Sequence, residues 1–74
     1  MAIEDLKAAA ANVARELREG NQSKELRARF VAIRAELFQR GIFDPVLVRF
    51  DSATVPPITP AEAAVELAKV AEAL

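Results

Sequence analysis

The chain has 74 residues, of which 53% are hydrophobic and 28% are charged, and its formal net charge is −1. This length allows one domain, 1–74, with a core of marginal size, and the composition is typical of a folded protein rather than a disordered one. Cysteine and histidine are both absent, which excludes disulfides and ordinary zinc sites. Oligomerisation is then the remaining common way to complete a small core.

The first segment, 2–19, predicts an amphipathic helix. Its apolar residues recur at spacings of three and four, which places them on one helical face; they are Ile3, Leu6, Ala10, Val13 and Leu17. Gly20 follows and is expected to end the helix, because a residue at positive φ commonly terminates helices and glycine adopts that conformation most easily.

The next segment, 23–40, predicts a helix that carries two apolar rows. Ser23 is a suitable N-cap and Gly41 a suitable terminator. One row runs through Leu26, Phe30, Ile33 and Leu37, and Val31 and Phe38 form a second row more than a quarter-turn away. Because the loop at 20–22 is short, we expect an antiparallel hairpin with the first helix. Two rows imply two neighbours, and the second neighbour is either the rest of this chain or another polypeptide.

The segment after Gly41 fits two structures. Asp44 and Pro45 form a good N-cap and first helical position, which favours a short helix over 45–51. The residues from Val46 to Phe50 also alternate well enough for a strand. A lone strand would have no partner in this chain, so the helix is the preferred interpretation.

The last third of the chain predicts a stiff connector and a final helix. The proline-rich connector at 53–59 is expected to be extended, because a residue that precedes proline avoids the helical region. Thr59 and Glu62 then form a capping box around Pro60, which opens a helix over 60–73. Its apolar face covers about half of the circumference, which suggests two neighbours. The predicted fold is an all-α bundle: an antiparallel hairpin, a short third helix and a C-terminal helix, completed by oligomerisation.

Residues suited to catalysis are scarce. Histidine, cysteine, tyrosine and tryptophan are absent, and the two glycines stand far apart as helix terminators. A serine nucleophile would lack an ordinary base, and no phosphate-binding glycine loop or calcium loop is present. We therefore expect a protein that is not an enzyme and that uses no cofactor or metal.

One tripeptide, Asp51-Ser52-Ala53, resembles the Asp-Ser-Leu attachment motif of acyl carrier proteins. The resemblance would imply a covalent group on Ser52. The context differs, because a proline-rich connector follows where the carrier fold has a helix, and the third residue is alanine. We interpret Ser52 as a turn or helix-end residue.

Charge is unevenly distributed along the chain and supports a second hypothesis. Eight basic and five acidic residues lie from Arg15 to Arg49, whereas one lysine and four acids follow. A basic helix, the Gly41 turn and a short helix loosely resemble a helix-turn-helix, so a nucleic-acid-binding regulator that uses the basic middle helix is the alternative function. Against it, the segment 45–50 is almost entirely apolar and the net charge is near zero, which makes nucleic acid an unlikely partner.

The amount of apolar surface favours a protein partner. Four phenylalanines and the broad last helix are more than one small chain is expected to cover. We therefore predict a small non-catalytic interaction module, either a homodimer or an accessory subunit of a larger complex. The predicted interface residues are Val31, Arg34, Phe38, Arg40, Ile42, Phe43, Arg49 and Phe50.

The sequence also bears on location. The acidic start of the chain is not followed by the apolar run of a secretory signal, and no window approaches the roughly 20 apolar residues of a membrane span. We expect a cytoplasmic protein that does not bind membranes.

Overall fold

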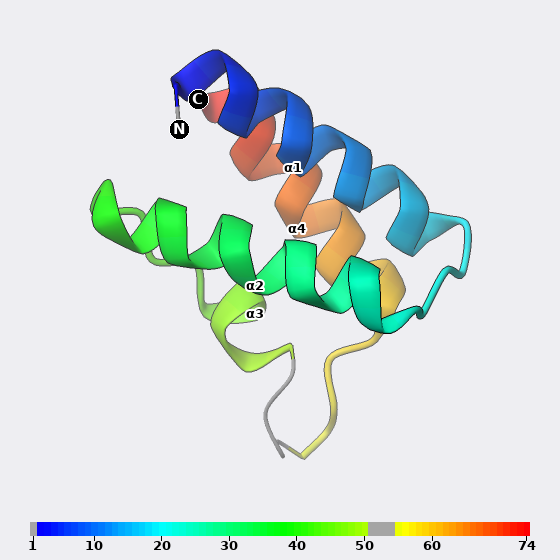
Figure 1. Cartoon of the computed structure of the whole chain (residues 1–74). Helices are drawn as coiled ribbons and strands as arrows, with labels where there is room; N and C mark the ends of the chain where they lie inside the picture. The colour runs from blue at the N-terminus through cyan, green and yellow to red at the C-terminus, as the bar shows by residue number, and fades with distance from the viewer. Residues whose placement is uncertain (1, 51–54) are drawn as a thin grey trace.

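A computed structural model of the chain describes residues 2–50 and 55–74, and four helices lie within these ranges (Figure 1). They are α1 (Ile3–Arg18), α2 (Lys24–Gln39), α3 (Pro45–Arg49) and α4 (Pro60–Ala73). The predicted all-α fold is confirmed, and the predicted helix ends that lie within these ranges differ from the observed ones by at most one residue. The predicted helix end at 51, the turn at Ser52 and the first part of the 53–59 connector lie outside the described residues.

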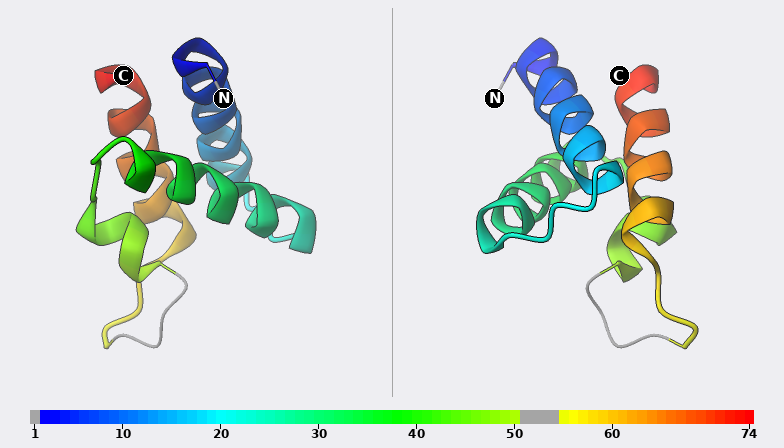
Figure 2. Two further views of the ribbon diagram at one scale, coloured as in Figure 1. Left: turned by 60° about the vertical axis from the view of Figure 1, so that its left-hand side comes forward. Right: turned by 90° about the vertical axis from the view of Figure 1, so that its right-hand side faces the viewer.

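The arrangement centres on α1. Helices α1 and α4 lie side by side and run in opposite directions, so the N-terminal and C-terminal ends meet at the same end of the molecule (Figures 1 and 2). Helix α2 crosses this pair. The most extensive interface joins α1 to α4, a second joins α1 to α2, and α3 packs against α4.

Local signals in the sequence set the helix ends. The Ser23 hydroxyl accepts a hydrogen bond from the Leu26 backbone N–H at 3.1 Å and so caps α2. Gly20 and Gly41 follow α1 and α2 at φ +87° and +79°, a region that other residues rarely adopt. Both glycines therefore end a helix as predicted.

The ambiguous segment after Gly41 is the short helix α3 rather than a strand. The Asp44 carboxylate accepts hydrogen bonds from the backbone N–H groups of Val46 at 2.9 Å and Leu47 at 3.2 Å. These bonds satisfy two donors that have no partner inside the helix. They also orient Leu47 into the core, where it is fully buried.

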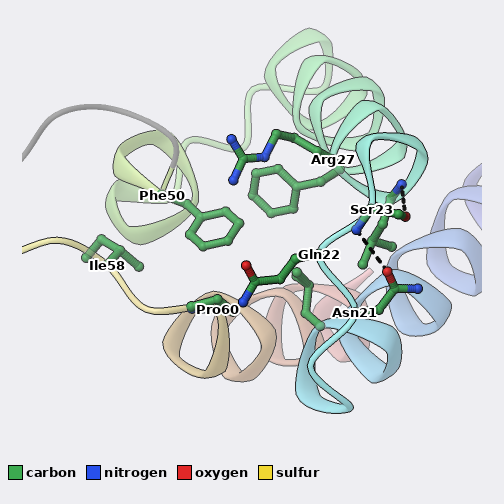
Figure 3. A pocket seen from close by; sticks show the side chains of 10 residues that line it. Asn21, Gln22, Ser23, Arg27, Phe50, Ile58 and Pro60 are labelled. Atoms are coloured by element: carbon green, nitrogen blue, oxygen red, sulfur yellow. Dashed lines mark hydrogen bonds between the residues drawn. The ribbon is translucent and has the colours of Figure 1, made fainter.

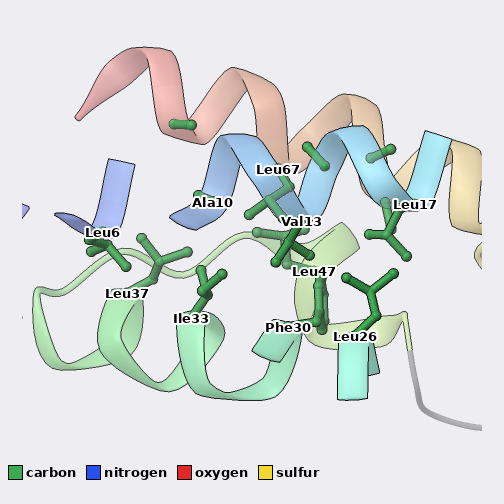
Figure 4. Close-up of a cluster of buried hydrophobic side chains, with 14 residues drawn as sticks. Leu6, Ala10, Val13, Leu17, Leu26, Phe30, Ile33, Leu37, Leu47 and Leu67 are labelled. Carbon is green, nitrogen blue, oxygen red and sulfur yellow. The ribbon is translucent and has the colours of Figure 1, made fainter. Parts of the chain in front are cut away.

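The interface of α1 with α2 follows the predicted apolar rows. Leu6 lies beside Leu37 and Leu17 lies beside Leu26, so the two helices meet in antiparallel order (Figure 4). Ile3 departs from the prediction, because its side chain is 46% exposed. Leu6 already meets the last turn of α2, and Ile3 lies one turn beyond it.

Small residues form the interface of α1 with α4. Ala14 of α1 and Ala68 and Ala71 of α4 line the same contact region, and the buried set also includes Ala10, Ala63 and Ala64. Alanines allow two helix backbones to approach closely and keep full helix propensity. The broad apolar face of α4 is therefore covered within the chain, by α1 and α3, and gives no support for a partner.

This interface predicts that a larger side chain at Ala14 is destabilising. Ala14→Leu forces a branched side chain between α1 and α4 and should lower the free energy of unfolding by about 1 to 3 kcal/mol. Ala8→Leu is the matched control, because Ala8 is exposed on the same helix. Urea unfolding followed by circular dichroism measures both variants, and equal midpoints for the two would contradict the close packing.

Candidate functional site

The four phenylalanines form two separate pairs. In the first pair, the rings of Phe30 and Phe50 meet edge to face, with centroids 5.1 Å apart and planes inclined by 70°. Phe30 is buried, and Phe50 covers the core from the end of α3. An edge-to-face contact places the positive ring edge against the negative face of its neighbour. Phe50, predicted at an interface, thus closes the core of its own chain.

The second pair lies outside the core. The rings of Phe38 and Phe43 are also 5.1 Å apart, at 31° to each other. Phe38 at the end of α2 is half-buried, whereas Phe43 in the following loop is 68% exposed. Val31, two helical turns before Phe38, is 39% exposed. We call these three residues the Phe38–Phe43 surface.

The predicted arginines have contacts within the chain. The Arg34 guanidinium donates a hydrogen bond through Nη1 to the Leu47 carbonyl at 3.1 Å and lies 5.6 Å from the centre of the Phe30 ring. Arg34 therefore joins α2 to α3 by a charged hydrogen bond, and it makes a cation–π contact with Phe30 of its own helix. Arg40 and Arg49 are exposed and also have interaction partners.

Of the eight predicted interface residues, Val31, Arg40, Phe43 and Arg49 are exposed, and the half-buried Phe38 lies against Phe43. Phe50 and Ile42 pack against the core, and Arg34 holds α2 against α3. Val31, Phe38 and Phe43 remain available for contact. Helical spacing could not predict that Phe43 is exposed while Phe50 packs against the core, because neither residue lies within a long helix.

An open groove that was not predicted from the sequence lies between α3 and α4. Its volume is about 390 Å³, and it is lined by Val46, Ala61, Glu62, Val65 and Glu66. Val65 is 49% exposed and lies outside the buried face of α4. A signal was present, because Ala61 and Val65 are four residues apart and lie outside the buried row of this helix.

Two carboxyl groups meet beside this groove. The pKa of Glu66 is raised, first by a hydrogen bond with the Asp44 side chain, then by the negative charge of Asp44 and by partial burial. Lys69 acts in the opposite direction, with its ammonium nitrogen 3.6 Å from a Glu66 carboxylate oxygen. Asp44 follows Phe43 in the chain, so this contact connects the Phe38–Phe43 surface to the groove.

A second pocket, of about 270 Å³, lies between the α1–α2 loop, the end of α3 and the segment that leads into α4 (Figure 3). Phe50, Ile58 and Pro60 supply apolar walls. Two of its polar residues have structural roles: the Asn21 side-chain oxygen Oδ1 accepts from the Ser23 backbone N–H at 3.0 Å, and the Ser23 hydroxyl caps α2.

Within residues 2–50 and 55–74, no cluster of three acidic, histidine or cysteine side chains could hold a metal ion. None of the helices in these ranges has the length and apolar character that crossing a membrane requires. Comparisons of the chain with protein-family models, curated proteins and solved structures find no match.

The Asp44–Glu66 contact predicts a specific pH dependence. A raised pKa in the folded state means that protonated Glu66 stabilises the fold at low pH and that this contribution is lost as the pH rises through the raised pKa. Glu66→Gln keeps a hydrogen-bond donor and removes the repulsion, so it should raise the thermal midpoint at pH 7.

The advantage of Glu66→Gln over the wild type should shrink as the pH falls from 7 towards 4.5, the ordinary pKa of glutamate, because Glu66 in the folded wild type takes up its proton above that value. Lys69→Gln is the control, because it removes the ion pair with Glu66 and keeps both carboxyl groups. Thermal melts across this pH range provide the measurement. A Glu66→Gln variant that melts below the wild type at neutral pH would contradict the assignment.

Proposed function

We propose that this protein is a small non-catalytic protein–protein interaction module that binds its partner through the Phe38–Phe43 surface. The partner is a second copy of the chain or a larger subunit. The observation that carries the proposal is the 68% exposure of Phe43 with Phe38 stacked beside it.

An exposed aromatic pair is unusual for a chain that buries its other aromatic side chains. Phe30 is almost completely buried and Phe50 covers it, so the chain has the means to shelter aromatic rings. Aromatic side chains supply large contact areas with little loss of conformational entropy and dominate binding energy at interfaces. Because Phe38 limits the movement of the Phe43 ring, part of the ordering needed for binding is already present in the free chain.

The form of α3 supports a protein partner over a nucleic acid. A recognition helix must present polar side chains to base edges. Helix α3 has five residues, of which Leu47 is buried and Val46 lines the α3–α4 groove. Arg49 is its single charged side chain, so α3 is poorly suited to reading a sequence.

The proposal predicts that Phe43→Glu removes the partner and leaves the fold intact. A carboxylate at the centre of an apolar contact must lose its water, which is strongly unfavourable without a counter-charge. The assay is native mass spectrometry of the chain isolated from its own cells, with circular dichroism as the check on folding. The wild type should carry an additional mass that the variant lacks.

Val48→Glu is the matched control. Val48 is 42% exposed on α3 but does not belong to the Phe38–Phe43 surface, so this variant should retain the partner. An unchanged native mass for Phe43→Glu, or equal losses from both variants, would contradict the proposed surface.

A further inference from the structure

The pocket between the α1–α2 loop, the end of α3 and the segment that leads into α4 combines an apolar interior with a polar edge (Figure 3). Leu17, Leu26 and Phe30 belong to the core and are at most 6% exposed where they line it. The half-buried apolar residues that complete the lining are Phe50, Ile58 and Pro60. An apolar lining with a few polar groups is typical of sites that bind small molecules.

The charged group of this pocket is Arg27, which is exposed on α2. Other arginines of α2 are engaged within the chain: Arg29 pairs with Glu16 at 2.8 Å, and Arg34 donates to the Leu47 carbonyl at 3.1 Å. Within residues 2–50 and 55–74, Arg27 has neither an ion pair nor a hydrogen bond through its side chain. Its guanidinium is therefore available to an anion in the pocket.

A second polar side chain at the edge, that of Gln22, is also available. Its neighbours Asn21 and Ser23 form the hydrogen bonds of the α1–α2 loop, whereas the Gln22 amide has no partner in the part of the chain that the structure describes. Figure 3 shows the Gln22 amide and the Arg27 guanidinium on opposite sides of the Phe50 ring. A ligand that covers this ring can thus meet polar groups from two directions.

Size and charge define the class of ligand. The pocket has a volume of about 270 Å³, which suits a compound of about ten non-hydrogen atoms, since one water molecule occupies roughly 30 Å³ in the liquid. Arg27 is the single charged residue among the described residues of the lining. One guanidinium matches the charge and the planar shape of one carboxylate, whereas a phosphate with nearly two negative charges would call for further cations.

We propose that this pocket binds a small carboxylate with an apolar body. The carboxylate pairs with Arg27, the body lies against Phe50 and Ile58, and the Gln22 amide donates a hydrogen bond to a further polar atom of the ligand. The site is separate from the proposed protein-binding surface, because Val31, Phe38 and Phe43 do not line the pocket.

Fluorine NMR of the chain labelled with fluorophenylalanine tests this site, with 3-phenylpropionate as the probe. The resonances of Phe30 and Phe50, which line the pocket, should shift as the probe is added, whereas those of Phe38 and Phe43 should stay constant. The neutral 3-phenylpropionamide has nearly the same shape and should bind at least about tenfold more weakly, because hydrogen bonds to charged groups are the stronger ones.

Two results of this titration would overturn the inference. One is the absence of a shift at Phe30 and Phe50 up to about 10 mM probe, which is close to the weakest affinity expected for a ligand of this size. The other is equal affinity for the carboxylate and the amide, because the guanidinium would then have no part in binding.

A pair of variants tests the role of Arg27. Arg27→Gln should lower the affinity for 3-phenylpropionate at least about tenfold, since it removes the charged partner of the carboxylate. Lys24→Gln is the matched control, because Lys24 is an exposed cation of the same helix that does not line the pocket. Its affinity should stay within about twofold of the wild type, since exposed charges are screened. Circular dichroism checks that both variants fold, and equal losses from the two would overturn the inference.

Discussion

The close packing of α1 against α4 through alanine is the constraint on which the rest of the structure depends. A chain of 74 residues has little apolar volume, and small residues between these helices make the most extensive interface in the molecule from very few atoms. While the alanines of α1 pack against α4, the larger side chains of α1 pack against the apolar row of α2. Leu6, Val13 and Leu17 thus complete a core with Leu26, Phe30 and Leu37.

Because this small core is complete without every apolar side chain, part of the apolar surface stays exposed. Leu47 anchors α3 in the core, and Arg34 holds the Leu47 carbonyl from α2. Phe50 then closes the core against Phe30. The loop that connects α2 to this docked helix presents Phe43 outward, and Phe38 supports its ring from the end of α2. The Asp44 and Glu66 carboxyl groups also lie close together beside the apolar groove, and their proximity raises the pKa of Glu66.

Much of this fold could be predicted from the sequence, because its signals are local. Ser23, Asp44 and Thr59 cap α2, α3 and α4, and Gly20 and Gly41 end α1 and α2. The apolar rows of α1 and α2 meet as expected, apart from Ile3. The role of each phenylalanine could not be predicted, since it depends on where α3 docks. The breadth of the apolar face of α4 suggested a second chain, yet α1 and α3 cover it. The groove also required the structure, because residues from two helices form it.

The central claim is that Phe30 and Phe50 complete the core while Phe38 and Phe43 form the proposed contact surface. Fluorine NMR of the chain labelled with fluorophenylalanine tests it most directly, because four phenylalanines give four resonances that single Phe→Leu variants assign. When the partner binds, whether it is a second copy at rising protein concentration or a larger subunit added to the sample, the resonances of Phe38 and Phe43 should shift together, whereas those of Phe30 and Phe50 should stay constant. Four resonances that do not change on binding, or a shift confined to Phe30 and Phe50, would contradict the account.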